Sequence, residues 1–267
     1  MLLTPHRNVR FFYGCAENKI GHTSNMRLHR FYYPDQIDER KDSIVSNAEL
    51  LHQWKNVFRY EKGQRLTLFN GEGIEYACEV VSLTRDEAVL HTLEKHEKPE
   101  LSSGSRGVEL WLVAALIKKD NFEWIIQKAT ELGVSHIVPV VSERSEKKNL
   151  NMERAQKLLV EASEQSGRAT LPTLNTPEDL DVAIESLTSG DEEKMNFFAF
   201  DPSGKQFEMS DKEGIKRAAI LIGPEGGWSD KELDYFRSKN IPIYSIGSQI
   251  LRAETAAVAI STLLLLS

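Results

Sequence analysis

Apolar and polar residues follow two different patterns along this chain. From residue 26 to residue 100, short apolar runs bounded by turn residues predict β-strands. Two of them, at 64–69 and 74–83, flank a strong hairpin signal, Asn70-Gly71-Glu72-Gly73. Apolar residues spaced three and four apart over residues 48–58 predict a helix. Together these elements predict a small β-barrel that carries one helix.

From residue 108 onward, longer apolar runs alternate with amphipathic helices. Residues 108–116 are almost unbroken in apolar character, as expected for a central strand of a parallel sheet. A helix over 122–132 follows and ends at Gly133, a residue typical of helix C-termini. This order predicts a parallel α/β domain. The further elements expected here are helices at 152–166, 178–187 and 254–266, and strands at 134–141, 196–200, 219–222 and 243–246.

Composition suggests where the chain divides. Residues 101–107, Leu-Ser-Ser-Gly-Ser-Arg-Gly, have the composition of a linker. We therefore place the barrel at 26–100 and the α/β domain at 108–267. Residues 1–25 show no clear periodicity, and we interpret them as an N-terminal extension or a poorly ordered arm.

Two strand-to-glycine turns near the C-terminus organise the α/β domain. Strand 219–222 runs into Gly223-Pro224-Glu225-Gly226-Gly227, and strand 243–246 runs into a second glycine turn at Gly247. Ser229 and Glu232 have the spacing of a capping box for the helix after the first turn. A glycine turn alone is most often structural. We expect these two units to be adjacent, which would bring both turns together at the carboxyl ends of the strands. Ligands of open α/β sheets bind at that edge.

The longer strings around these turns resemble those of a known class of enzymes. Gly-Pro-Glu-Gly-Gly-Trp-Ser at 223–229 and Ile-Leu-Arg-Ala-Glu-Thr-Ala at 250–256 closely resemble the SPOUT class of S-adenosylmethionine-dependent RNA methyltransferases. Within that class, the chain resembles the family that methylates N3 of a uridine in 16S (small-subunit) ribosomal RNA. The strings at 131–134 and 164–168 add to this likeness. The resemblance implies a C-terminal parallel-sheet domain with a trefoil knot, an N-terminal PUA-like RNA-binding barrel, and a homodimer with the active site at the subunit boundary.

The resemblance also implies a set of cofactor-binding residues. In the family, backbone groups of both turns hold S-adenosylmethionine, and glycines permit its close approach. The residues expected to bind the cofactor are Leu221, Ile222, Gly223, Pro224, Glu225, Gly226, Gly227, Ile246, Gly247, Ile250, Leu251, Arg252 and Thr255. No metal is expected, because the sequence holds no cluster of metal ligands.

Methylation of uridine N3 requires that this nitrogen lose its proton, which spreads negative charge over O2 and O4. A guanidinium is well suited to receive that charge, so Arg252 and Arg168 are catalytic candidates. Either could instead position a phosphate or form a structural ion pair. Glu254 and Glu225 are candidate bases, but we favour a role for both carboxylates in fixing loop geometry.

Arginines are the candidate RNA contacts, since phosphate binding needs only a local basic patch. The alternative is that each is an ordinary solvated surface residue. The candidates are Arg27, Arg30, Arg59 and Arg65 in the barrel and Arg144 in the polar loop 142–148.

Charge and cysteine content narrow the functional classes. The 267 residues carry a net charge of −7, which argues against a non-specific RNA coat. Cys15 and Cys78 lie far apart, which fits a reducing cytoplasm, and no apolar run approaches the roughly 20 residues of a membrane span. A non-catalytic RNA-binding or scaffolding protein remains an alternative. A nucleotide-binding enzyme is disfavoured, because no phosphate-loop or dinucleotide-binding glycine string occurs.

Overall fold

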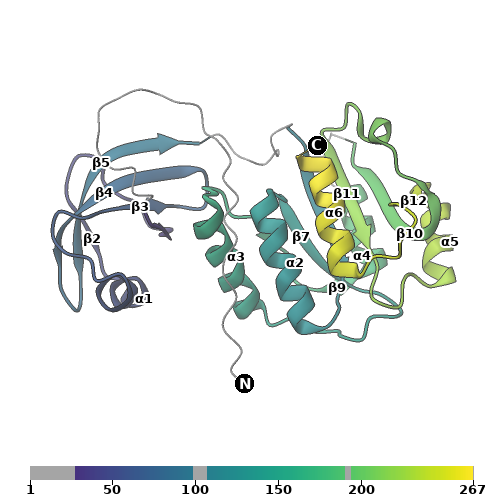
Figure 1. Ribbon diagram of the computed structural model, residues 1–267, viewed down its shortest axis with the longest axis horizontal. Helices are drawn as coiled ribbons and strands as arrows, with labels where there is room; N and C mark the ends of the chain where they lie inside the picture. The colour runs from purple at the N-terminus through teal and green to yellow at the C-terminus, as the bar shows by residue number, and fades with distance from the viewer. Residues whose placement is uncertain (1–27, 99–106, 190–193, 267) are drawn as a thin grey trace, which may run out of the picture.

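The computed structural model describes residues 28–98, 107–189 and 194–266. Within these ranges the chain forms two sheets. They lie side by side, and α3 stands between the first sheet and the other helices of the α/β part (Figure 1). The predicted extension at 1–25, the candidate Arg27 and residues 101–106 of the predicted linker lie outside the described residues.

The first sheet has the strand order β1-β3-β4-β5-β2, with β1 parallel to β3 and the other pairs antiparallel. The predicted hairpin at Asn70–Gly73 connects β3 to β4. A core of buried apolar residues, centred on Trp54 and Phe31, joins the helix to the strands. The elements are β1 (Arg30–Tyr32), β2 (Ser43–Val45), α1 (Ala48–His52) with a π-helical turn η1 (Gln53–Val57), β3 (Arg65–Phe69), β4 (Ile74–Leu83) and β5 (Ala88–Glu97).

The second sheet is parallel throughout, in the order β12-β10-β11-β6-β7-β8, with β9 also paired to β7. Its strands are β6 (Glu109–Ala115), β7 (His136–Val141), β8 (Thr173–Leu174), β9 (Glu178–Asp179), β10 (Asn196–Gln206), β11 (Arg217–Ile222) and β12 (Ile243–Ser245). Its helices are α2 (Lys119–Leu132), α3 (Met152–Ser166), α4 (Leu180–Ser189), the short 3₁₀ turn η2 (Met209–Lys212), α5 (Asp230–Ser238) and α6 (Ala253–Leu265).

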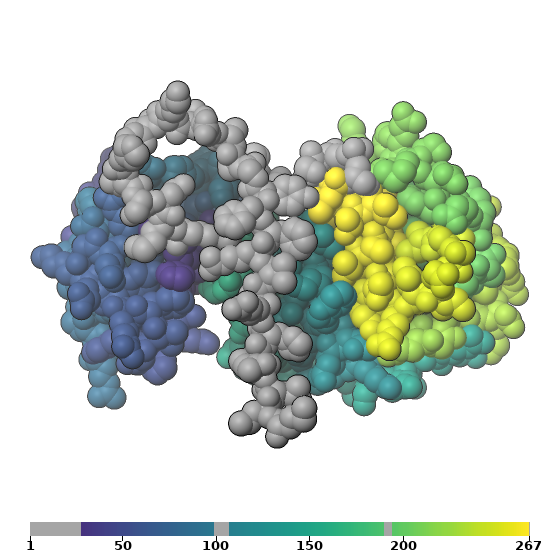
Figure 2. All heavy atoms as spheres, in the orientation of Figure 1, coloured from purple at the N-terminus to yellow at the C-terminus, as the bar shows by residue number. Residues whose placement is uncertain are grey.

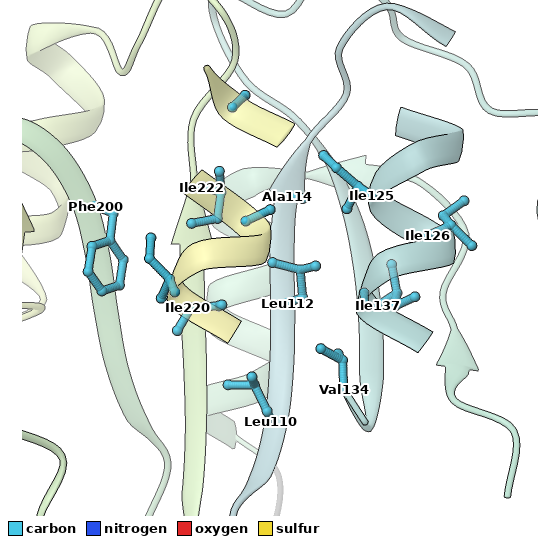
Figure 3. Packing of buried hydrophobic residues seen from close by; sticks show 14 of the residues in the cluster. Leu110, Leu112, Ala114, Ile125, Ile126, Val134, Ile137, Phe200, Ile220 and Ile222 are labelled. Atoms are coloured by element: carbon cyan, nitrogen blue, oxygen red, sulfur yellow. The ribbon is translucent and has the colours of Figure 1, made fainter. Parts of the chain in front are cut away.

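Helices cover both faces of this sheet, as the apolar pattern of β6 predicts. Leu110, Leu112 and Ala114 point to the face covered by α2, α3 and α6 (Figure 3). Trp111 and Val113 point to the opposite face, which α4 and α5 cover. Successive side chains of a strand face opposite sides, so a strand buried on both faces must be apolar at every position.

Several local predictions are confirmed. Ser229 and Glu232 form the predicted capping box of α5. Gly133 ends α2 in a left-handed conformation with φ 96°. Two starts differ: α2 begins at Lys119 rather than 122, and α4 begins at Leu180, because Glu178–Asp179 pair with β7 as a short strand.

The two glycine-turn strands are not neighbours, which corrects the prediction that the two units are adjacent. β10 lies between β11 and β12 and pairs with both. β10 also continues past the predicted end at Phe200, with a shift of register between Phe200 and Lys205. Gly204 permits this, because a Cβ at that position would lie 2.6 Å from the backbone oxygen of Ile243.

The chain from β12 to α6 returns to the middle of the sheet. α6 packs beside α2, over β6 and β11, although β12 is the edge strand. The segment 246–252 between them therefore passes the carboxyl ends of β10 and β11. The knot that the family resemblance implies stays a prediction.

Candidate active site

A cleft of about 810 Å³ opens at the carboxyl ends of β10, β11 and β12. Both predicted glycine turns line it, so the expected meeting of the two turns in one site is found even though another strand separates them. A third loop, Phe200–Ser203, supplies one wall, and Ala256 and Ile260 of α6 lie at the inner end.

Hydrogen bonds to three other segments hold the β11 turn in place. Arg144 Nη1 donates to the backbone oxygens of Gly226 at 2.9 Å and of Trp228 at 3.0 Å. The Trp228 indole nitrogen donates to the Phe200 oxygen at 3.1 Å, which ties the turn to β10. Glu225 Oε1 accepts from the Lys118 amide at 3.3 Å. The turn is therefore shaped before any ligand binds.

Glycine is required in this turn for a packing reason. A Cβ at Gly223 would lie 3.2 Å from the Trp228 ring, and Gly227 has a φ of 67° that other residues rarely adopt. Arg144, a predicted RNA contact, lies at the edge of the cleft with one nitrogen committed to the turn. Its side chain is nevertheless exposed, so an RNA contact at this position stays a prediction.

The loop after β12 forms the outer wall of the cleft and is more open. Ile250 is 84% exposed, and the Arg252 side chain is equally exposed at 84%. Arg252 Nη1 lies 4.0 Å from Glu254 Oε1. The Glu254 side chain is only 13% exposed, and its Oε2 is buried without a hydrogen-bond partner. Arg252 thus extends from the cleft toward solvent, with Glu254 behind it.

Three of the other predicted site residues do not line the cleft. Leu221 is fully buried in β11. Thr255 is exposed on the first turn of α6, and Glu254 lies beneath Arg252. The remaining predicted cofactor-binding residues all line the cleft.

The structure places Arg168 outside the cleft, so its predicted catalytic role has no support in this geometry. The residue is 5% exposed, and its Nη1 donates to the oxygens of Val134 at 2.7 Å and Thr130 at 3.3 Å. Thr130 belongs to the last turn of α2, and its oxygen also accepts from the Gly133 amide at 3.2 Å. Burial lowers the pKa of the Arg168 guanidinium to about 10. Its donors are used to cap a helix and to hold the start of β7.

Arg168 and Glu164 instead belong to the junction between the two sheets. Glu164 Oε1 accepts from the Tyr32 amide at 3.0 Å, and burial raises the pKa of this carboxyl to about 7. The Arg168 backbone oxygen accepts from Arg30 Nη2 at 3.3 Å. Main-chain bonds complete the junction, from Gly73 N to Ala169 O at 3.2 Å and from Leu171 N to Gly71 O at 2.8 Å.

Arg30, a predicted RNA contact, is largely buried in this junction. It forms an ion pair with Glu75, which also pairs with Lys98 Nζ at 2.8 Å. Burial acts to raise the pKa of Glu75, but the hydrogen bonds from Arg30 and Lys98 outweigh it and hold this pKa below its usual range. Arg30 therefore has a structural role that the sequence did not indicate.

The two other described arginines of the barrel lie at its surface. Arg65 Nε is 3.8 Å from Glu79, and both side chains are exposed. Arg59 has a φ of 54° and stands between two aromatic residues, Phe58 and Tyr60, whose rings stack at 5.9 Å. Both rings also contact Phe31 and pack against the core of the first sheet.

The irregular stretch Phe200–Ser203 inside β10 is the main part of the cleft that sequence reasoning missed. Asp201 Oδ1 accepts hydrogen bonds from the Ser203 amide at 2.9 Å and the Ser203 hydroxyl at 2.5 Å. The string Asp201-Pro202-Ser203-Gly204 has the composition of any turn, so only the position of β10 between β11 and β12 reveals its place in the site.

The described residues contain neither a metal-binding cluster nor a membrane-spanning helix. No group of three or more His, Cys, Asp or Glu side chains there could hold a metal ion. No helix in the described ranges is both long enough and apolar enough to cross a membrane.

Comparison with known proteins identifies both parts of the chain. A family model described as an RNA methyltransferase domain matches residues 105–265. A second, described as an RNA methyltransferase PUA domain, matches residues 55–93. The predicted fold class, a parallel α/β domain of the SPOUT type preceded by a PUA-like domain, is thereby confirmed.

Curated relatives match over nearly their whole length. The ribosomal RNA small subunit methyltransferase E of Rickettsia conorii is 30% identical over 237 residues, covering 87% of this chain and 93% of the relative. The protein of the same name from Bacillus subtilis is 30% identical over 235 residues, covering 83% and 88%.

Solved structures share the whole fold. A putative methyltransferase from Legionella pneumophila, in complex with the bound cofactor SAM, is 26% identical with a TM-score of 0.76 and covers 90% of this chain and 97% of its own. The ribosomal RNA small subunit methyltransferase E from Neisseria gonorrhoeae, bound to S-adenosyl methionine, has the same TM-score of 0.76 at 24% identity over 88% and 96%. This chain therefore belongs to the RNA methyltransferase family of the ribosomal RNA small subunit methyltransferases E.

Proposed function

We propose that this protein is a cytoplasmic S-adenosylmethionine-dependent methyltransferase that modifies N3 of a specific uridine in 16S ribosomal RNA. One observation supports this most strongly: the two turns with family-like strings, 223–227 and 246–252, meet in one cleft of about 810 Å³. That volume lies within the range of about 300–1,000 Å³ typical of small-molecule sites. A related structure that holds SAM supports the same cofactor here.

The cleft can orient a cofactor and exclude water from it. S-adenosylmethionine, when bound, supplies an electrophilic methyl group. We assign binding of the adenosine to backbone groups of 222–227 and 246–251, and apolar contact to Trp228, Leu233 and Ile260, because all of them line the cleft. Holding the reacting atoms in line in this way removes much of the entropic cost of the reaction.

Arg252 is the residue that we propose to act on the RNA. Its guanidinium lies at the exposed mouth of the cleft, where negative charge on uridine O2 and O4 would develop. We assign Glu254 to positioning this guanidinium rather than to proton transfer, because it lies behind Arg252 and does not line the cleft.

We further propose that residues 26–100 form an RNA-binding domain, that 101–107 join it to a transfer domain at 108–267, and that two copies associate. Ile250, Leu251 and Leu266 are exposed apolar residues near α6. Figure 2 shows the C-terminal residues, in yellow, at the surface of the molecule. A second copy on this face would cover apolar surface next to the cleft.

Methyl transfer can be tested directly. Small subunits and naked 16S RNA from cells that lack the protein are incubated with labelled S-adenosylmethionine and the purified protein. The modified nucleoside is then identified by mass spectrometry. We expect label in N3-methyluridine at a single site. Tight binding of RNA without any transfer would contradict the proposal and identify a non-catalytic RNA-binding protein instead.

A further inference from the structure

The irregular stretch inside β10, where its pairing with β12 shifts register, brings a carboxylate into the proposed cofactor cleft. Asp201 lines the cleft together with both glycine turns. Its Oδ1 is held by two hydrogen bonds from Ser203, so the orientation of the carboxylate is fixed. Its Oδ2 faces the β11 turn, because a Cβ built on Gly227 would lie 3.9 Å from that oxygen. The second oxygen is therefore directed toward the ligand space between two loops.

The other charged groups of the cleft are already engaged. Arg144 donates to the oxygens of the β11 turn, and Glu225 accepts from the Lys118 amide. Arg252 extends into solvent, with Glu254 4.0 Å away. In the described part of the chain, no cationic side chain forms an ion pair with Asp201, and its hydrogen bonds come from Ser203.

An unpaired carboxylate in a partly buried cleft costs free energy unless a ligand compensates it. The walls around Asp201 include Phe200, Trp228 and Tyr244, which reduce contact with water. A cation bound in this cleft would recover the cost through a charge-assisted interaction. The methionine end of S-adenosylmethionine carries two positive charges, on the sulfonium and the α-ammonium, and one negative α-carboxylate, while its adenosine carries no charge.

We propose that Asp201 recognises the positive charge of the methionine end of S-adenosylmethionine and so selects a charged donor. The inference rests on the proposed function, because it takes that cofactor as the ligand of the cleft. Asp201 is a binding and specificity residue, distinct from Arg252, which faces the RNA.

The test measures how three ligands bind to the wild-type protein and to Asp201→Asn. S-adenosylmethionine carries both cations, S-adenosylhomocysteine carries only the ammonium, and 5′-methylthioadenosine carries neither. Asparagine keeps the shape of aspartate and an oxygen that can accept from Ser203. Calorimetry should show that the substitution weakens binding of S-adenosylmethionine about tenfold, the effect of losing one charge-assisted contact, while 5′-methylthioadenosine binds as before.

S-adenosylhomocysteine shows which cation Asp201 recognises. An equal loss of affinity for S-adenosylmethionine and S-adenosylhomocysteine identifies the ammonium as the group that Asp201 recognises. A loss of affinity for S-adenosylmethionine alone identifies the sulfonium. Both results support the proposal. An equal loss for 5′-methylthioadenosine would overturn it and indicate a contact to the ribose. Unchanged binding of all three ligands would overturn it as well.

Two controls separate this proposal from others. Asp234→Asn removes a carboxylate from the exposed face of α5, outside the cleft lining, and should change none of the three affinities. Thermal melting confirms that each variant is folded. If the wild-type protein binds none of the three ligands, then the proposed function itself fails, which is a different result from failure at Asp201.

Discussion

At the scale of single residues, three arginines with similar sequence signals have three different roles. Arg252 is exposed at the mouth of the cleft, Arg144 holds the β11 turn, and Arg168 is buried beneath the junction of the two sheets. A guanidinium with five donors can serve each role, so residue type does not separate them. The three arginines differ in burial and in hydrogen-bond partners. These differences lead to opposite predictions for Arg252 and Arg168.

Replacing Arg252 should affect activity and not stability. Because the side chain is exposed, Arg252→Ala should change the free energy of unfolding by no more than about 0.5 kcal/mol. Loss of charge stabilisation should lower the rate of methyl transfer about 100-fold or more. Single-turnover transfer assays and urea unfolding measure the two effects. Arg237→Ala, an exposed arginine of α5, is the matched control and should retain full activity.

Replacing Arg168 should do the reverse. Arg168→Ala leaves the Val134 oxygen without this donor, removes one donor of the Thr130 oxygen and opens a cavity, and we expect a loss of about 2–4 kcal/mol in the free energy of unfolding. Urea denaturation measures this loss. A fully stable Arg168→Ala protein with no transfer activity would contradict the structural role and restore the catalytic interpretation.

At the scale of elements, the site depends on how β10 lies between β11 and β12. β10 pairs with β12 through a register shift, and the loop inside that shift carries Asp201 into the cleft. Gly204 is what permits the close approach of the two strands. The geometry of the cleft is therefore set by a strand irregularity and not by the glycine turns alone.

Gly204→Ala should accordingly loosen this edge of the sheet. Its Cβ would lie 2.6 Å from backbone atoms of Ile243 and Tyr244, which cannot move as a flexible side chain would. We expect a loss of about 1–3 kcal/mol in stability, measured by urea unfolding, with weaker cofactor binding. Gly226→Ala is the control for stability, since its Cβ would meet only Arg144 at an ordinary 3.5 Å. Equal stability of the two variants would refute the packing argument.

At the scale of the whole molecule, the junction sets where the barrel stands relative to the cleft. Main-chain bonds from the hairpin of the first sheet and the contact from Glu164 to the Tyr32 amide hold the two sheets together. If the barrel binds RNA as we propose, that RNA must reach a cleft that belongs to the other sheet. These bonds fix that separation, so we assign the string at 164–168 to the junction, and a catalytic role of Arg168 stays a prediction.

The junction predicts a pH dependence of stability. Burial raises the pKa of Glu164 to about 7, so the folded state keeps a proton that the unfolded state releases near the ordinary carboxyl pKa of 4.5. The resulting stabilisation is complete below pH 4.5 and is lost as pH rises through about 7. Glu164→Gln keeps an acceptor for the Tyr32 amide without the charge, so it should be more stable than wild type at pH 8, by about 1–2 kcal/mol.

Urea unfolding between pH 5 and pH 8 measures this difference. The wild-type protein should lose stability relative to Glu164→Gln across that range. Glu153→Gln, at an exposed position on the same helix, should keep the wild-type pH dependence. Parallel curves for wild type and Glu164→Gln would show that the carboxyl is not titrating in the junction.

Local pattern was sufficient for most of the elements and for half of the site. The apolar run of β6, the helix at 152–166 and the capping box of Ser229 and Glu232 depend on neighbours within a few residues, so they could be predicted directly. The strings at 223–229 and 250–256 identified the family and part of the cleft lining.

What the sequence by itself determined is therefore the set of elements, their caps and turns, and the family. Only the tertiary structure decided that β10 lies between the two turn strands, that Asp201 enters the cleft, and that Arg168, Arg30 and Glu164 meet at a junction. The physical reason is distance along the chain. Arg30 and Arg168 are 138 residues apart. The residues near each of them in the sequence do not indicate that the two come into contact when the chain folds.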